Sequence, residues 1–338
     1  MASSTQPKTA LKIVFGAMTL GKEGSEQGRV HSLEDCTKIL DVFQAHGHNE
    51  IDTARLYSGG SSEEYLGQLK WQERGLIMDT KLAPVGRLRP ELGRYTHAKE
   101  DVGPGLQDSL DALQTDKVDL WYLHAPDHLT PYAETLEAVN ELYKAGYFQR
   151  FGISNFSAWE VAQVCELCDR NGWKKPDVYQ GVYNALHRIV EPELFPCLRH
   201  YGIAFYEFNP VAGGMLTDRY QRNTSEHEEG SRFDPNKLQG GLYRARYWND
   251  AYFDALDVIR PVAKKLGLTT AEAAVRWVSH HSLMKREHGD AIIIGASSAT
   301  QLEENLTNLE KGPLPEEMVK AFDEGWAIVK GVCKPYFF

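Results

Sequence analysis

The feature that most constrains the fold of this chain is a regular alternation of short apolar runs with longer amphipathic stretches. Runs rich in β-branched and other apolar residues predict eight strands, at residues 12–16, 49–52, 76–81, 118–124, 151–154, 178–181, 203–208 and 291–295. Helical periodicity predicts helices at 33–47, 61–69, 102–113, 132–145, 158–171, 192–200, 254–266, 271–280 and 302–309. Strands that lead one after another into helices are typical of a parallel sheet in an α/β protein.

Eight such units predict a single (β/α)8 TIM barrel that takes in residues 1–338. Two doubly wound domains are the alternative, but they need a linker near the middle, and no Pro/Gly/Ser-rich or charge-biased boundary occurs there. A loop from residue 209 to about 248 follows the seventh strand, and the chain ends in a C-terminal extension. Loops of this length are usually functional. The arginines and aromatic residues of the 209–248 loop predict that it closes on an anion.

The charge and composition of the chain argue against several classes of binding partner and location. The chain has 37 Lys+Arg and 47 Asp+Glu, a formal net charge of −10, so long-range repulsion argues against nucleic acid as a partner. No apolar run is long enough to span a membrane, and the first residues contain no apolar signal core. The five cysteines are few and odd in number, which predicts reduced thiols in a cytoplasmic protein.

Two motifs are set aside. Residues 16–22 resemble a phosphate-binding loop, but Glu23 stands where a Mg²⁺-binding hydroxyl is needed. Cys165 and Cys168 form a C-x-x-C, yet they lie within an amphipathic helical pattern without a second pair. We interpret them as buried thiols and expect no metal.

Four unusual side chains stand at or just after the ends of three neighbouring predicted strands. Asp52 ends the second strand and Tyr57 follows it, Lys81 ends the third, and His124 ends the fourth. All strands of a (β/α)8 barrel point their carboxyl ends to one mouth, where active sites lie. A carboxylate, a phenol, an ammonium and an imidazole are therefore expected to converge.

This set can activate a carbonyl group. A buried lysine ammonium beside a tyrosine is expected to lower the pKa of the phenol, and Asp52 is expected to keep Lys81 charged. Tyr57 then serves as proton donor, and His124 orients the same substrate oxygen. The set lacks a nucleophile and a metal, so a hydride from a cofactor is the natural other half of the reaction.

Asp52-x4-Tyr57, Lys81 and His124 resemble the catalytic tetrad of the aldo-keto reductases, and the resemblance covers nearly the whole chain. It implies a barrel that reduces small-molecule carbonyl compounds. It also implies which residues hold the cofactor. These are Ser154, Asn155, Gln180, Phe208, Asn209, Pro210, Val211, Gly213, Gly295, Ser297, Gln301, Glu304 and Asn305.

NADPH is the expected cofactor. An adenosine 2′-phosphate favours Arg or Lys, but the 297–305 segment contains no basic residue. The resemblance implies that Arg219 and Arg232 of the long loop supply positive charge over the phosphates.

Segments 57–63, 213–217, 246–248 and 336–337 are most similar to the aflatoxin-aldehyde reductases. That branch implies aldehyde and dicarbonyl substrates, NADPH and a homodimer. Relatives in it tend to end with an arginine that meets a substrate carboxylate, whereas this chain ends with Phe338. An apolar or aromatic aldehyde or ketone is therefore expected. The residues expected to contact it are Met18, Tyr243, Arg246 and Phe338.

Two other functions are open at this point. One is an NADPH-binding subunit that senses redox state for a protein partner, because relatives of that kind can retain the tetrad. The other is a metal-dependent barrel hydrolase, which needs His and Asp ligands where these strand ends supply Lys and Tyr. Turnover of aldehydes with NADPH separates the reductase from the sensor.

Overall fold

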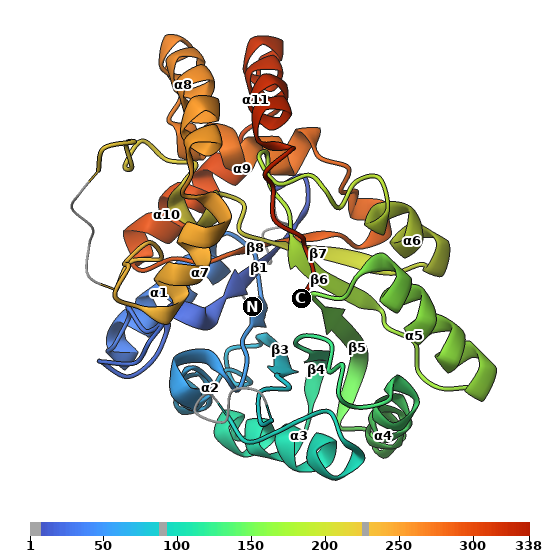
Figure 1. Cartoon of the computed structure of the whole chain (residues 1–338). Helices are drawn as coiled ribbons and strands as arrows, with labels where there is room; N and C mark the ends of the chain where they lie inside the picture. Colours follow the sequence, from blue (N-terminus) through green and yellow to red (C-terminus); the bar gives the residue numbers. More distant parts are fainter. Residues whose placement is uncertain (1–7, 88–92, 225–229) are drawn as a thin grey trace.

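The computed structural model describes residues 8–87, 93–224 and 230–338, and it confirms the predicted (β/α)8 barrel (Figure 1). Eight parallel strands pair in chain order, and β1 also pairs with β8, so the sheet closes. The strands are β1 Lys12–Gly16, β2 Glu50–Asp52, β3 Ile77–Leu82, β4 Val118–Leu123, β5 Phe148–Ser154, β6 Val178–Val182, β7 Ala204–Phe208 and β8 Ala291–Ile294.

Helices surround the barrel (Figure 1). They are α1 Leu33–Ala45, α2 Ser61–Gln68, α3 Lys99–Leu113, α4 Tyr132–Ala145, α5 Ala158–Asn171, α6 Leu194–Tyr201, α7 Leu238–Tyr247, α8 Asp250–Lys265, α9 Thr270–His281, α10 Ala299–Leu309 and α11 Glu316–Val329. In the described part of the chain, no helix is both long and apolar enough to cross a membrane.

Successive side chains along each strand point alternately out of and into the barrel, so they form two separate layers of the core. Outward side chains such as Phe15, Ile51 and Trp121 join the large core between sheet and helices. Inward side chains fill the barrel, and Val14, Leu120, Val178, Tyr206 and Ile293 form a separate apolar cluster there. The interior is therefore packed, and only side chains at the carboxyl ends of the strands reach the mouth.

The predicted strands agree with the observed ones within three residues at either end, but two helices were not predicted. Helix α7 lies inside the long loop, where adjacent glycines at 240 and 241 weaken the helical pattern. Helix α11 lies in the C-terminal extension and packs along α8. The long loop is thus partly an ordered helix, and its residues 225–229, which include Glu226, Glu228 and Glu229, lie outside the described part.

Candidate active site

The four predicted catalytic side chains meet at the mouth of the barrel. Lys81 is fully buried on β3, and its Nζ donates to Asp52 Oδ2 at 2.6 Å and to the Thr53 carbonyl at 2.7 Å. The same nitrogen lies 3.4 Å from the hydroxyl of Tyr57. The ring of Tyr57 meets that of His124 edge-on, with centroids 5.7 Å apart. The strand-end argument therefore placed all four side chains in one constellation.

A tight turn after β2 presents Tyr57 to Lys81. Ser58 has φ 51° and Gly60 has φ 94°, so the chain reverses sharply between Tyr57 and α2. The Arg55 guanidinium crosses this turn and donates to the Gly60 carbonyl at 3.0 Å and to Glu63 at 3.1 Å. Glu63, fully buried on α2, also accepts a hydrogen bond of 2.5 Å from Thr80, the neighbour of Lys81. One carboxylate thus ties the Tyr57 turn to the strand that carries the lysine.

The expected lowering of the Tyr57 pKa is wrong for the free protein. Burial of the phenol raises its pKa above the ordinary value, and the nearby Lys81 ammonium opposes this only in part. Tyr57 therefore carries its proton at neutral pH. That is the protonation state a general acid requires.

The charge state expected for Lys81 is supported. Burial alone would lower its pKa, but Asp52 and Tyr57 outweigh burial, so the pKa is raised and the amine stays protonated. Burial raises the pKa of Asp52, against the effects of Lys81 and Gln180. Gln180 Nε2 donates to Asp52 Oδ1 at 2.8 Å across the barrel. One amide hydrogen of a predicted cofactor residue is thus donated to the Asp52 carboxylate.

His124 is a neutral imidazole at physiological pH. Burial lowers its pKa to about 3, and the Lys81 ammonium adds to that effect. Its carbonyl oxygen accepts a hydrogen bond from Asn155 Nδ2 at 2.9 Å, and the same Nδ2 lies 3.0 Å from Ser154 Oγ. These bonds fix the end of β5, with the predicted cofactor residues Ser154 and Asn155, beside His124.

Several residues predicted to hold the cofactor, with Arg232 predicted over its phosphates, meet around Tyr243 of α7. The Tyr243 hydroxyl donates to Asn209 Oδ1 at 2.9 Å, and its ring lies against Gly213, where an added Cβ would come within 2.3 Å of it. The Arg232 guanidinium lies 5.7 Å from the Tyr243 ring centroid, and its Nη2 faces the backbone of Gly295. Tyr243, predicted as a substrate contact, therefore packs against the predicted cofactor segments.

The arginines of the long loop divide into two kinds. Arg222 pairs with Asp250, Asp254 and Asp257 of α8. Arg244 donates to the Phe233 carbonyl at 2.7 Å and lies over a tryptophan ring. Both side chains have structural partners, and the expectation that the loop arginines close on an anion stays a prediction. By contrast, no side chain of the described residues forms an ion pair with Arg232, and its guanidinium is only partly exposed, which fits a phosphate ligand.

The other predicted cofactor residues line the same face. Phe208 ends β7, and Pro210 and Val211 lie just after it. The Ser297 backbone N–H donates to Gln301 Oε1 at 2.8 Å before α10 begins. Glu304 is exposed and Asn305 is half-buried on α10, while Arg219 is exposed and lies over the Tyr220 ring. The Arg219 guanidinium lies 5.3 Å from the centroid of the Tyr220 ring, which packs on Phe233 and through it on Tyr243.

A cavity of about 500 Å³ beside Ser297 contains basic residues that sequence reasoning missed. Arg29 and Lys38 line it together with Ser298 and the N-terminal turn of α1. They precede or lie within the first helix, so only the closure of β1 against β8 brings them to the segment after β8. A search for positive charge on the loop that follows the first strand could have found them.

Predicted substrate residues lie around the opening. The Met18 carbonyl accepts from Ser58 in the Tyr57 turn, and its sulfur faces Gln239 of α7. The Phe338 backbone N–H donates to the Asn155 carbonyl at 3.2 Å, so the last residue reaches the mouth (Figure 1). Arg246 lies near the buried His187 and the half-buried Cys333. Burial lowers the pKa of His187 to about 3 and Arg246 adds to that effect, whereas burial raises the pKa of Cys333 to about 11 and Arg246 opposes it.

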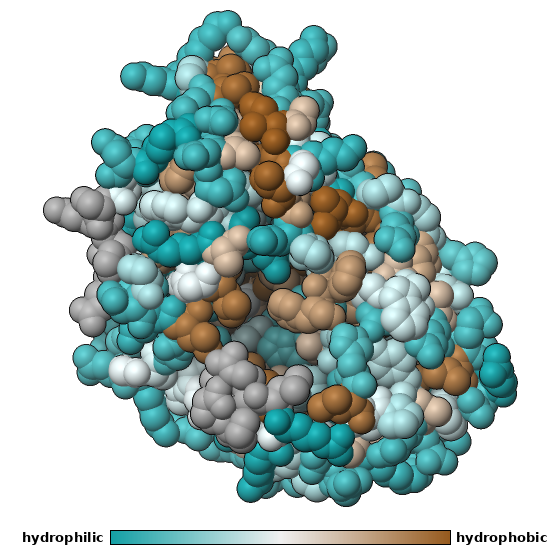
Figure 2. Space-filling model, in the orientation of Figure 1, coloured by the Kyte–Doolittle hydropathy of each residue, from teal (hydrophilic) through white to brown (hydrophobic). Residues whose placement is uncertain are grey.

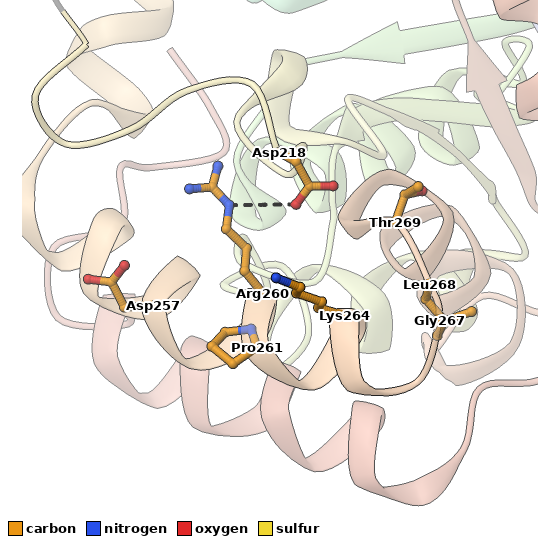
Figure 3. Close-up of a pocket in the computed structure, with 8 residues that line it drawn as sticks. All are labelled: Asp218, Asp257, Arg260, Pro261, Lys264, Gly267, Leu268 and Thr269. Carbon is orange, nitrogen blue, oxygen red and sulfur yellow. Dashed lines mark ion pairs between the residues drawn. The ribbon is translucent and has the colours of Figure 1, made fainter.

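A larger cavity, about 790 Å³, lies away from these residues (Figure 3). It is formed by α8, the turn into α9 and Asp218, which Arg260 faces at 3.9 Å. None of its lining residues belongs to the predicted site. Among the described residues no cluster of three or more His, Cys, Asp or Glu has the geometry of a metal site.

Comparison with known proteins agrees with this geometry. The model of the aldo/keto reductase family matches residues 12–327. An aldo-keto reductase of Pseudocercospora fijiensis is 64% identical over 88% of this chain and 100% of its own length. An aldo-keto reductase of Monascus ruber is 51% identical over 99% of both chains. The human aflatoxin B1 aldehyde reductase member 2 is 41% identical over 100% of this chain and 92% of its own.

Proposed function

The chain belongs to the aldo/keto reductase family, as an oxidoreductase that acts on carbonyl compounds with a nicotinamide cofactor, and we propose that NADPH is that cofactor and Tyr57 the general acid. We further propose that the substrate is an apolar or aromatic aldehyde or ketone, or a dicarbonyl, which is reduced to the alcohol. The observation that carries the proposal is the Lys81 ammonium, held between the Asp52 carboxylate and the Tyr57 hydroxyl.

The bound cofactor supplies a hydride to the carbonyl carbon. Tyr57 donates its phenolic proton to the carbonyl oxygen as the C=O π bond breaks and negative charge develops there, so that the O–H bond of the alcohol forms and a phenolate is left. Lys81 lies 3.4 Å from the phenolic oxygen and stabilises the phenolate that is left. His124, neutral beside the Tyr57 ring, donates a hydrogen bond that orients the substrate oxygen.

Two features support NADPH over NADH. Arg232 is partly buried and forms no ion pair with a described side chain, between Tyr243 and Gly295. Arg29 and Lys38 line the cavity beside Ser297, although Asp35 pairs with Lys38 there. A phosphate is a strong acceptor for guanidinium and ammonium groups.

The rim of the mouth supports an apolar substrate. Leu129 follows β4, Trp159 begins α5, Leu242 lies on α7 and Phe338 ends the chain, with exposed fractions of 54%, 63%, 62% and 66%. Leu129, Trp159 and Leu242 belong to segments that follow the carboxyl ends of strands, and Phe338 is hydrogen-bonded to Asn155 just after β5. Figure 2 shows a hollow over the centre of the barrel with apolar surface beside it. Several relatives are named for aflatoxin B1 aldehyde, which supports an aldehyde among the substrates.

The free cysteines are compatible with the proposed cytoplasmic location. The homodimer stays a prediction.

The experiment is turnover of a panel of aldehydes and ketones, followed as the loss of NADPH absorbance. We expect aromatic and long-chain aldehydes to be reduced faster than small acid-aldehydes. Tyr57→Phe should abolish reduction and leave NADPH affinity nearly unchanged, because the phenol contributes a proton rather than binding. Near wild-type turnover by this variant would reject the general-acid role, and no turnover of any compound by the wild type would favour a redox-sensing subunit.

A further inference from the structure

Below the catalytic residues, the end of the barrel interior far from the mouth holds a network of charged groups. Arg150 of β5 donates to Asp119 Oδ2 at 2.6 Å and to Glu50 Oε1 at 3.1 Å. It also donates to the Tyr206 hydroxyl at 2.9 Å. Lys12 of β1 pairs with Glu50 and lies 3.0 Å from the same hydroxyl. Two cations are thus shared by Glu50 and Asp119.

Asp79 of β3 belongs to this network but has no donor. Its side chain is fully buried, and neither carboxyl oxygen accepts a hydrogen bond from any described residue. The nearest cation is Arg150 Nη2, at 3.8 Å, which is already bonded to other groups. If Asp79 were ionised, the network would hold one carboxylate more than its cations. A buried carboxylate that accepts no hydrogen bond, and whose nearest cation is shared with other carboxylates, is strongly disfavoured.

Asp79 also lies next to the catalytic pair. It is the register partner of Asp52 on β2, and it precedes Lys81 by two positions, so all three side chains face the barrel interior. The other polar groups that face it are Glu50 on β2, Tyr122 on β4, Arg150 on β5 and Tyr206 on β7. Burial raises the pKa of Asp79 well above the ordinary value, Glu50 and Asp52 add to this, and Arg150 opposes it.

We propose that Asp79 is a protonated, neutral carboxylic acid in the folded protein, and that its neutrality leaves Asp52 as the one carboxylate that competes with Tyr57 for Lys81. The proton stays on a carboxyl oxygen of Asp79, where it is available for donation to Glu50. An ionised Asp79 would add a second negative charge beside Asp52. That charge would disfavour the Tyr57 phenolate that proton donation leaves behind. Asp79 is thus a positioning residue that sets the local charge and does not touch the substrate.

The protonation is tested by stability, without reference to catalysis. Above about pH 4 the unfolded chain has an ionised Asp79, so unfolding of the wild type releases a proton that unfolding of Asp79→Asn does not release. Between about pH 5 and pH 8, the folding equilibrium constant of the wild type should therefore fall about tenfold per pH unit relative to that of the variant. Denaturant titrations at several pH values measure this difference. Asp41→Asn, which removes an exposed carboxylate, should keep the wild-type slope.

Equal slopes for wild type and Asp79→Asn would overturn the proposal. Should the variant not fold, infrared spectra of wild-type protein with ¹³C-labelled aspartate carboxyl groups give the same decision. A protonated aspartate band that persists at about pH 8 supports the proposal, and its absence overturns it.

The effect on the site rests on the proposed role of Tyr57 and has its own readout. Asparagine reproduces the neutral acid, so Asp79→Asn should reduce the substrate with a kcat within about twofold of the wild-type value. The alkaline limb of its pH profile should stay at the wild-type pH. A shift of that limb to lower pH would mean that a negative charge had been removed from beside Lys81, which overturns the proposal. Failure of the Tyr57 assignment would appear in Tyr57→Phe and would leave the stability result unaffected.

Discussion

Gln180 Nε2 on β6 lies 2.8 Å from Asp52 Oδ1 on β2, so a hydrogen bond crosses the barrel mouth from a predicted cofactor residue to the carboxylate that binds Lys81. Asp52 is fully buried, and its two oxygens are divided between Gln180 and Lys81. The orientation of the carboxylate therefore depends on the same amide that is predicted to face the cofactor.

We expect Gln180→Ala to slow reduction about tenfold, because a hydrogen bond to a buried charged group is worth about 1.5–3 kcal/mol. Loss of that donor should also raise the pKa of Asp52 further, since Gln180 now opposes the effect of burial. Single-turnover rates and cofactor affinity, measured separately, distinguish the two roles of the side chain. An unchanged single-turnover rate with weakened cofactor binding would show that Gln180 contacts the cofactor alone.

Glu63 should determine how well Tyr57 is placed. Its carboxylate joins Arg55, which crosses the Tyr57 turn, to Thr80, which adjoins Lys81. We expect Glu63→Gln to lower kcat about tenfold with little change in cofactor affinity, because a misplaced acid loses transition-state stabilisation. The matched control is Glu64→Gln, whose carboxylate instead pairs with Lys22 on the surface. Equal kcat values for the two variants would contradict this role.

Buried histidines should make the protein sensitive to acid. Burial lowers the pKa of His97 to about 4, and its Nε2 lies 3.1 Å from the Leu82 carbonyl. Between about pH 6.5 and pH 4 the unfolded state binds a proton at this residue that the folded state does not, so the stability is present at neutral pH and is lost as pH falls. His97→Gln preserves a donor for Leu82. The wild type should lose up to about 1.4 kcal/mol per pH unit more than this variant over that window, measured by denaturant unfolding. Parallel stability curves would show that His97 is protonated in the fold.

The barrel and the tetrad could be predicted because both depend on local patterns. Strand periodicity located Asp52, Lys81 and His124 at strand ends, and barrel topology brings all such ends to one mouth. What could not be predicted depends on tertiary partners. The sign of the Tyr57 pKa shift follows from how deeply the phenol is buried, which outweighs the neighbouring ammonium. Nothing in a linear sequence supplies that balance.

Tertiary ion-pair partners also determine which arginines of the long loop are available to bind a phosphate. Arg222 and Arg232 are equivalent as sequence features, yet three α8 carboxylates bind the first and none from a described residue binds the second. Asp79 is likewise an ordinary polar residue in a strand until the register places it beside Asp52. Helix α7 was not predicted for a different reason. Its adjacent glycines have low helix propensity, and packing stabilises the helix in spite of them.

Arg232 gives the sharpest test of cofactor choice. If its guanidinium binds the 2′-phosphate, Arg232→Ala should weaken NADPH binding by about 1.5–3 kcal/mol, or roughly 10- to 150-fold, and leave NADH binding nearly unchanged. Arg222→Ala is the matched control, because it removes an arginine of the same loop that is already ion-paired with α8. Fluorescence titration of both variants with both cofactors measures the four affinities. Equal weakening of NADPH and NADH by Arg232→Ala would place the guanidinium over the pyrophosphate, which the two cofactors share, and would leave Arg29 and Lys38 as the basic side chains to examine beside Ser297.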